Sequence, residues 1–372
     1  MNYIWVLLIS AVFTYLATYL VSYLAKKHSL YPKVRDRDVH SAPVPRIGGV
    51  AVIIGFVLTM ILLVIIYGDK GLVDFGFPYK ILGVSIDKRL LGILIATIIL
   101  GVIMLIDDVK SLKPWTKLSG QILAGIVLAL AGIGANYINN PFGNTIYLDA
   151  VKIPIALGSS IYHVVFWADL LLIAWVVILT NATNFIDGID GLASSLSLIA
   201  GAIIIAISLK FSQPSMAILA AAFSGAIIGF LPLNLPPAKM FLGDSGSMFL
   251  GLMLAVLTVI SGGKFATLLL VFGLVILDAV YVIFKRLIQG KNPFTSADQT
   301  HLHHRLIKAG FSKTWALLTI VFTSTLFGVL AVTLEGRVKL ITIAVLALLS
   351  LVSFVILDLS TQTRKKKSEK IS

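Results

Sequence analysis

Apolar runs of about 20 residues recur along this chain and restrict its fold more than any other feature. The first, YIWVLLISAVFTYLATYLVSYL, is typical, because a helix of that length crosses the roughly 30 Å hydrocarbon core of a bilayer. Hydrophobic residues make up 58% of the 372 residues and charged residues only 13%, unlike soluble domains. The sequence therefore predicts an all-α integral membrane protein.

Eleven runs are candidate transmembrane helices, and together they leave no room for a separate soluble domain. They lie near residues 3 to 24, 47 to 67, 90 to 106, 118 to 135, 166 to 182, 192 to 209, 215 to 232, 246 to 261, 264 to 284, 314 to 333 and 338 to 357. The first run lacks a preceding basic stretch and a cleavage pattern, so we expect it to stay as a span. We predict one polytopic domain over residues 1–372.

The basic residues set the expected orientation. If the first run ends in the cytoplasm, most lysines and arginines, including the tail RKKKSEK, fall on the inner side. The positive-inside rule then predicts an outer N terminus and a cytoplasmic C terminus. The net charge of +13 is explained by anionic lipid and an anionic substrate, and no nucleic-acid partner is expected. The absence of cysteine excludes disulfides and thiolate ligands.

Five polar segments fall on the predicted cytoplasmic side: SAPVPRIGG, IDDVKSLKPWTK, NATNFIDGIDG, NLPPAKMFLGDSG and QTHLHHRL. The predicted outer loops, 68–89 and 136–165, carry only scattered charges and are interpreted as connectors. Polar and ionisable residues next to apolar spans are costly and often functional. The convergence of five such loops predicts a site at one membrane surface.

The first acidic motif is the pair Asp107 and Asp108. Adjacent carboxylates repel each other unless a cation or a shared proton relieves the repulsion. Taken alone, the pair is better explained as a solvated helix end balanced by Lys110, Lys113 and Lys117.

In the second motif, polar residues recur every three positions, at Asn181, Asn184, Asp187 and Asp190. This spacing places them on one helix face, while each Asp-Gly favours a turn, so the span should end in an oxygen-rich loop. Such oxygens are the ligands that Mg²⁺ prefers. Turns that cap helices explain one Asp-Gly, but not four polar residues in register.

Three further features carry charge. Asp244, in FLGDSGS, precedes an apolar span, where it can cap a helix or mark a phosphate site at the helix N terminus. The segment HSAPVPRIGG offers His40 and Arg46 in a rigid basic loop. Asp278 lies inside a predicted span, about two turns before Arg286, and should pair with a basic group, functionally or structurally.

The motif HLHHRL combines histidines with an arginine, a combination that suits phosphate binding or proton transfer. Without cysteine or an HExxH pattern, a zinc site is less well supported. Carboxylates for a divalent cation and basic groups for phosphates on one face fit phosphoryl transfer to a lipid phosphate. A cation-coupled transporter is the alternative from another class, but its acids should lie near the bilayer midplane.

The ordered motifs DD, NxxNxxDGxDGL, FLGDSGS and HxHHRL resemble the polyprenyl-phosphate N-acetylhexosamine-1-phosphate transferase superfamily over about 300 residues. HLHHRL and HSAPVPRIGG resemble the bacterial branch that loads N-acetylglucosamine-1-phosphate from UDP-GlcNAc onto undecaprenyl or decaprenyl phosphate, which starts teichoic acid, O-antigen or arabinogalactan synthesis. The peptidoglycan branch, which transfers phospho-MurNAc-pentapeptide, usually has three consecutive histidines, a run that Leu302 breaks here.

The resemblance implies a multi-pass protein of the bacterial plasma membrane, often dimeric, with ten or eleven helices, a cytosolic cleft and Mg²⁺ or Mn²⁺ as cofactor. It implies Asp107 as the candidate base, with Asp108 and Asp187 as further catalytic residues in the same cleft. Asp244 and Asn184 are the implied metal ligands. The implied substrate-binding residues are Asp190, Asn234 and Phe241 for uridine, His301, His303, His304 and Arg305 for the donor's phosphates and sugar, and Lys117 and Arg46.

Overall fold

The structure is a computed structural model that describes residues 3–28, 44–67, 78–81, 84–135, 137–138, 144–157, 160–260, 272–290, 301–334 and 336–369. It forms two compact units, Met1–Phe265 and Ala266–Ser372. His40 lies outside the described residues.

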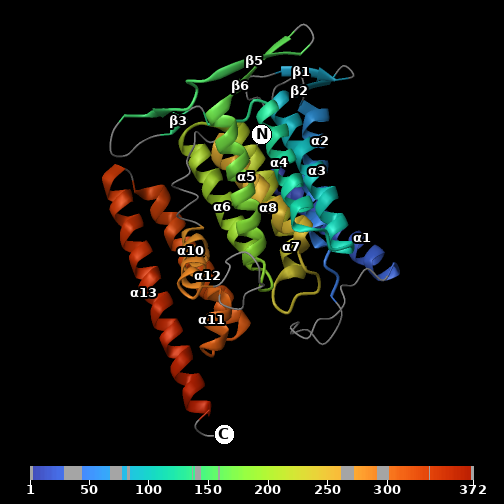
Figure 1. The fold of residues 1–372 in the computed structure, drawn as a ribbon. Coiled ribbons are helices and arrows are strands. Elements are labelled where there is room, and N and C mark those ends of the chain that lie inside the picture. Colours follow the sequence, from blue (N-terminus) through green and yellow to red (C-terminus); the bar gives the residue numbers. More distant parts are fainter. Residues whose placement is uncertain are drawn as a thin grey trace. The chain divides into compact units, whose positions relative to one another are not determined.

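The first unit is a helical bundle with small sheets at one end (Figure 1). Its helices are α1 (Tyr3–Lys27), α2 (Gly48–Tyr67), α3 (Lys88–Val109), α4 (Pro114–Leu130), α5 (Phe166–Ile186), α6 (Leu192–Lys210), α7 (Pro214–Asn234) and α8 (Gly243–Ile260). Asp87 caps α3 by accepting from the Arg89 and Leu90 N–H groups, and Pro114 opens α4, where a missing N–H is harmless.

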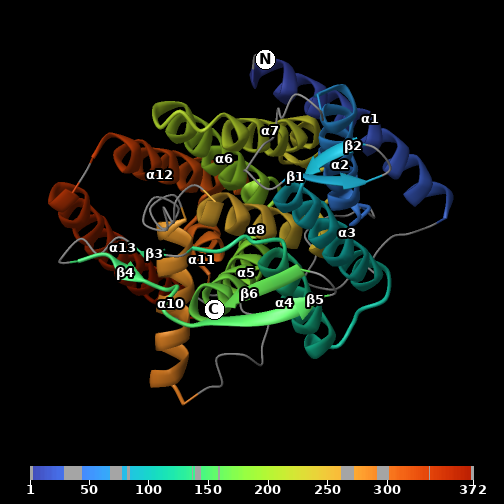
Figure 2. The same ribbon diagram turned by 90° about the horizontal axis from the view of Figure 1, so that it is seen from above.

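Helix α8 is the centre of the first unit, and α2, α3, α5, α6 and α7 pack around it (Figure 2). All its residues from Gly243 to Val259 are buried. Small residues allow close helix approach elsewhere in the bundle: a methyl group at Gly225 or Gly229 of α7 would lie 2.2 Å from a backbone oxygen of α1. The core is thus a tightly packed helical one.

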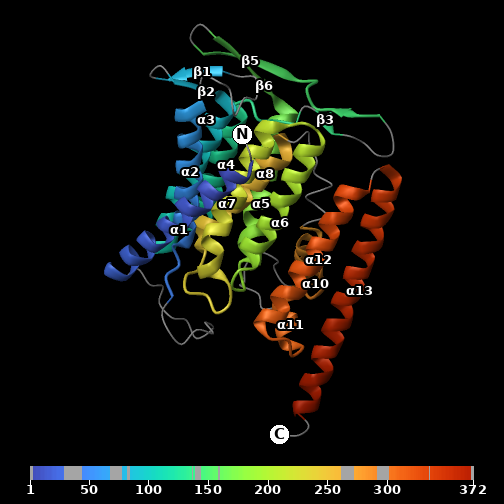
Figure 3. The same ribbon diagram turned by 180° about the vertical axis from the view of Figure 1, so that it is seen from behind.

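Three antiparallel pairs, which the sequence did not predict, occupy the predicted outer loops. They are β1 (Pro78–Ile81) with β2 (Val84–Asp87), β3 (Tyr137–Ile138) with β4 (Ile146–Tyr147), and β5 (Lys152–Leu157) with β6 (Ser160–Val165). These strands lie at the end of the first unit opposite the α3–α4 turn (Figures 1 and 3). The acidic motifs of the first unit lie at the other end.

The second unit contains α10 (Gly273–Ile288), α11 (Leu302–Lys308), α12 (Lys313–Thr333) and α13 (Gly336–Glu369). Helix α11 contacts α12 and α13, and α10 contacts the same two helices. The short α11 was not predicted, because its seven residues carry no apolar run.

Within the described residues, nine helices are long and apolar enough to cross a membrane: α1, α2, α3, α5, α6, α7, α8, α12 and α13. Helices α4 and α10, also predicted as spans, have only 17 and 16 residues in the described ranges. The prediction of an all-α, multi-pass membrane protein is therefore confirmed. Eleven spans and an outer N terminus stay predictions.

Candidate active site

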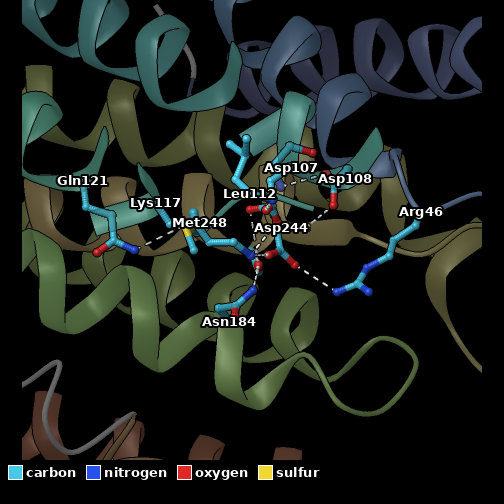
Figure 4. A network of polar contacts seen from close by, with 11 residues as sticks. Arg46, Asp107, Asp108, Leu112, Lys117, Gln121, Asn184, Asp244 and Met248 are labelled. Atoms are coloured by element: carbon cyan, nitrogen blue, oxygen red, sulfur yellow. Dashed lines mark hydrogen bonds and ion pairs between the residues drawn. The ribbon is translucent and has the colours of Figure 1, made fainter. Parts of the chain in front are cut away.

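Three helix ends bring the acidic motifs together in the first unit (Figure 4). Asp107 and Asp108 lie in the last turn of α3, and Asp244 lies in the first turn of α8. Asp108 Oδ1 accepts from the Asp244 N–H at 2.7 Å, and Asp108 Oδ2 accepts from the Ser245 N–H at 3.0 Å. The Asp108 carboxylate thus caps α8, an interaction that joins segments 136 residues apart.

Lys117, in the first turn of α4, connects the other two carboxylates. Its Nζ atom lies 2.5 Å from Asp107 Oδ2 and 2.6 Å from Asp244 Oδ2. Asp107 Oδ1 also accepts from the Leu112 N–H at 2.6 Å, which fixes the turn between α3 and α4. On its other side, Asp244 Oδ1 pairs with Arg46 Nη2 at 2.9 Å. Two cations therefore hold Asp244 in the free protein.

Backbone contacts place Arg46 beside α8. The Phe241 N–H donates to the Pro45 carbonyl, and Gly48 and Gly49 donate to the carbonyls of residues 241 and 242. At Gly243, φ is +76° and a Cβ would lie 2.1 Å from the Arg46 carbonyl, so only glycine fits this turn. The loops before α2 and α8 form one backbone-bonded structure.

The second motif joins α5 to α8. The Asn184 amide donates to Ser247 Oγ at 2.9 Å, and Thr183 Oγ1 donates to the Ser247 carbonyl at 2.7 Å. Asn181 donates instead to Gln121 Oε1 of α4 at 2.9 Å. The sequence analysis missed Ser247, although its position three residues after Asp244 places it on the same helix face.

Asp187 follows the end of α5 and interacts electrostatically with Arg46, Asp244 and Asp108. Removal of its carboxyl from water raises its pKa well above the usual range, against the influence of Arg46, while Asp244, Asp108 and Asp190 raise it further. Desolvation lowers the pKa of Arg46, but the nearby carboxylates of Asp244, Asp108 and Asp187 raise it, and the net shift is upward. The site thus carries an excess of carboxylates whose charge the free protein only partly neutralises.

The residues predicted to hold uridine support the loop between α7 and α8. Asp190 Oδ2 accepts from the Ala238 N–H at 3.1 Å. Asn234 is only 2% exposed: its carbonyl accepts from Ser194 Oγ, and its amide donates to the Met240 carbonyl. Phe241 is half-buried in this loop. Asp190 and Asn234 therefore position the loop that carries Phe241.

The HLHHRL motif begins α11 in the second unit. His303 and Arg305 are 4% and 3% exposed, whereas His301 and His304 are half-buried. Burial lowers the pKa of His303 to about 3, helped by His304, His301 and Arg305, so its imidazole is neutral near pH 7. Only His301 and His304 of this motif retain exposed surface of any size for a ligand.

The acidic cluster fits a divalent cation. Carboxylate oxygens of Asp107 and Asp244 both contact the Lys117 ammonium, so a positive charge is stabilised at this position. No group of three or more His, Cys, Asp or Glu side chains suited to a metal occurs within the described ranges. Mg²⁺ needs only one or two protein carboxylates when substrate phosphates and water supply the remaining oxygens.

The chain is similar to known proteins. Residues 90–262, which contain the acidic cluster, match the family described as "Glycosyl transferase family 4". The chain is 35% identical to the decaprenyl-phosphate N-acetylglucosaminephosphotransferase of Mycolicibacterium smegmatis, over 84% of this chain and 77% of that protein. It is 30% identical to the undecaprenyl-phosphate alpha-N-acetylglucosaminyl 1-phosphate transferase of Thermotoga maritima, over 86% of this chain and 87% of that protein.

A further relative covers nearly the whole chain. The probable undecaprenyl-phosphate N-acetylglucosaminyl 1-phosphate transferase of Bacillus subtilis is 26% identical over 96% of this chain and 92% of its own length. The matched region, the coverage and the converging acidic motifs agree, and this chain belongs to glycosyl transferase family 4.

Proposed function

We propose that the protein transfers N-acetylglucosamine-1-phosphate from UDP-GlcNAc to undecaprenyl or decaprenyl phosphate and releases UMP. The names of its relatives support this donor and acceptor over phospho-MurNAc-pentapeptide. The observation that carries the proposal is the contact of the Lys117 ammonium with both Asp107 and Asp244 at one end of the first unit. This arrangement offers a base, a cation site and a phosphate partner within a few ångströms.

In the proposed reaction, a carboxylate oxygen of Asp107 accepts the proton of the lipid phosphate. The freed phosphate oxygen attacks the β-phosphorus of UDP-GlcNAc, and the bond between that phosphorus and the oxygen bridging to the α-phosphorus breaks. UMP leaves, and a lipid-linked diphosphate remains. The Leu112 N–H holds Asp107 Oδ1, so Oδ2, now bonded to Lys117, is the oxygen that would receive the proton.

The surrounding residues bind and orient. Lys117 and Arg46 would neutralise phosphate oxygens, and Asp244 with Asn184 would hold Mg²⁺, with Mn²⁺ as a substitute. When bound, the cation neutralises charge on the transferred phosphate. Asp187 would lie beside this charge, while Phe241 and the loop that Asp190 supports would bind uridine. His301 and His304 would contact the donor's phosphates and sugar.

We also propose that the end of the first unit that carries the acidic cluster faces the cytoplasm, because that orientation agrees with the positive-inside rule applied to the sequence. The product would then begin a cell-envelope polysaccharide on the inner face of the plasma membrane.

The test measures UMP release by the purified full-length protein with Mg²⁺ and undecaprenyl phosphate, using UDP-GlcNAc and UDP-MurNAc-pentapeptide separately. We expect turnover with UDP-GlcNAc only, abolished by EDTA and in Asp107→Asn and Asp244→Asn. Asp149→Asn, which removes a carboxylate from an i,i+3 surface pair with Lys152, is the matched control and should keep full activity. Turnover with the pentapeptide donor alone, or EDTA-resistant turnover, would contradict the proposal.

A further inference from the structure

The second unit contains a buried charge cluster outside the acidic site. Asp278 of α10 is 5% exposed and Arg305 of α11 is 3% exposed. Arg305 Nη2 pairs directly with Asp278 Oδ1, and Arg305 Nη1 lies 3.8 Å from Asp358 Oδ1 of α13. The sequence analysis expected a basic partner for Asp278, and the structure identifies Arg305 as that partner.

Both terminal nitrogens of Arg305 are bonded, and its guanidinium lies against two aromatic rings. Its guanidinium lies 4.8 Å from the Tyr281 ring centroid and 4.6 Å from that of Phe354, and it donates to the Phe354 carbonyl. Lys285 and Tyr281 bond the same Asp358 carboxylate. A guanidinium that lies against two rings and pairs with the buried Asp278 carboxylate is a structural anchor, because leaving this position would strand that charge.

The other oxygen of Asp278 contacts the start of the HLHHRL motif. Asp278 Oδ2 accepts from the Leu302 N–H at 2.9 Å and lies 3.0 Å from His301 Nδ1. His301 is the N-cap residue of α11 but makes no capping bond with its own side chain. A helix of seven residues is marginal by itself, so the carboxylate from α10 supplies the missing cap.

The bond to Nδ1 has a chemical consequence for His301. A carboxylate accepts, so Nδ1 must carry the proton, and in the neutral ring the lone pair then lies on Nε2. The His301 side chain remains 21% exposed, whereas that of Asp278 is 7% exposed. Asp278 thus fixes both the tautomer of His301 and the orientation of its ring.

We propose that Asp278 is a positioning residue for the transferase reaction: with Arg305 it anchors α11 and holds His301 as the Nδ1–H tautomer, which presents Nε2 to the donor. This inference rests on the proposed function for the identity of the donor. Arg305 thereby acts through α11 and makes no direct contact with the donor's phosphates.

The first experiment reads the tautomer of His301 in the wild-type protein. The protein is labelled with ¹⁵N in its six histidines, the His301 signals are assigned by their loss in His301→Gln, and ring-nitrogen correlations are recorded in detergent. We expect a protonated Nδ1 on His301 in the wild-type protein and a shift toward Nε2–H in Asp278→Asn. An Nε2–H ring in the wild-type protein would overturn the proposal.

The second experiment measures kcat and KM for UDP-GlcNAc. Asp278→Asn should lower kcat/KM by about 10- to 100-fold, the usual effect of removing the outer carboxylate of a metal-bound histidine. Asp358→Asn is the matched control: it removes a carboxylate from the same cluster, leaves the Asp278–His301 bond in place and should change kcat/KM by less than about threefold.

Equal losses in both variants would reduce Asp278 to a purely structural role, and unchanged kcat/KM in Asp278→Asn would refute the positioning role. If the wild-type protein releases no UMP from UDP-GlcNAc, the proposed function fails, whereas the histidine spectrum still decides whether Asp278 sets the His301 tautomer.

Discussion

Asp107→Asn and Asp108→Asn should have different effects on stability, because the two carboxylates make different contacts. Asp108 accepts two N–H groups at the start of α8, at 2.7 and 3.0 Å. An asparagine offers one acceptor and turns an NH₂ group toward the second N–H. Losing a hydrogen bond to a charged group costs about 1.5–3 kcal/mol, and losing the anion at the helix N terminus adds about 0.3–1 kcal/mol.

This loss converts into a measurable shift. At roughly 2.1 cal/mol/K per residue, the 265 residues of the first unit have an unfolding entropy of about 0.56 kcal/mol/K. A destabilisation of about 2–4 kcal/mol then lowers Tm by about 4 to 7 °C. Activity should fall as well, by about 100-fold, because the backbone that carries Asp244 is no longer fixed by the Asp108 carboxylate.

The assay is thermal unfolding in detergent beside UMP release, for Asp108→Asn, Asp107→Asn and the surface control Asp149→Asn. Asp107→Asn should lose activity with a smaller change in Tm, because its remaining oxygen can still accept from the Leu112 N–H and Lys117 keeps its bond to Asp244. A wild-type Tm together with lost activity in Asp108→Asn would refute the capping argument and would assign Asp108 to the substrate or the cation.

Three other outcomes follow from the site. Lys117→Met should reduce UMP release by about 100-fold or more, yet bind Mn²⁺ several-fold more tightly in electron paramagnetic resonance titrations, because the competing ammonium is gone; weaker binding would contradict a shared cation position. The raised pKa of Asp187 means that the folded state binds its proton more tightly than the unfolded state, so this group lowers stability as pH rises through that pKa. Asp187→Asn should therefore raise Tm above pH 7, and the Tm difference from the wild-type protein should vanish toward acidic pH; a constant difference would contradict the pKa shift. A methyl group at Gly49 would lie 2.0 Å from the Gly246 amide nitrogen, so Gly49→Ala should yield no folded peak in size-exclusion chromatography, whereas Gly273→Ala, with nothing within 4 Å, should elute and melt like the wild-type protein.

The helices were predictable because each is a long apolar run, and lipid leaves few other structures to such a sequence. The strands β1 to β6 were not predicted, because their segments mix polar and apolar residues without a clear alternation. The short α11 gave no signal either, since it depends on a carboxylate from α10 for its first turn.

The candidate site was predictable in composition but not in its pairings. The sequence motifs identified Asp107, Asp108, Asp244 and Lys117 as candidates, because charged residues next to apolar spans are costly and often functional. Which charge meets which depends on the packing of helices far apart in sequence: Arg46 pairs with Asp244 across 198 residues, and Arg305 with Asp278 across 27. The helical spacing of residues in the sequence does not reveal these long-range pairs.

The central position of α8 has a consequence for biosynthesis. During translation, α3 is synthesised with Asp107 and Asp108 long before α8, the helix that Asp108 caps. Helices α2 and α5, which also pack against α8, are likewise synthesised before it. Until Gly243–Ile260 enters the membrane, the helices already synthesised lack the buried helix against which they pack. A ribosome-stalled chain that ends before residue 243 should therefore be protease-sensitive and bound by membrane chaperones. A chain long enough beyond Ile260 for α8 to clear the exit tunnel and insert should become resistant in a single step.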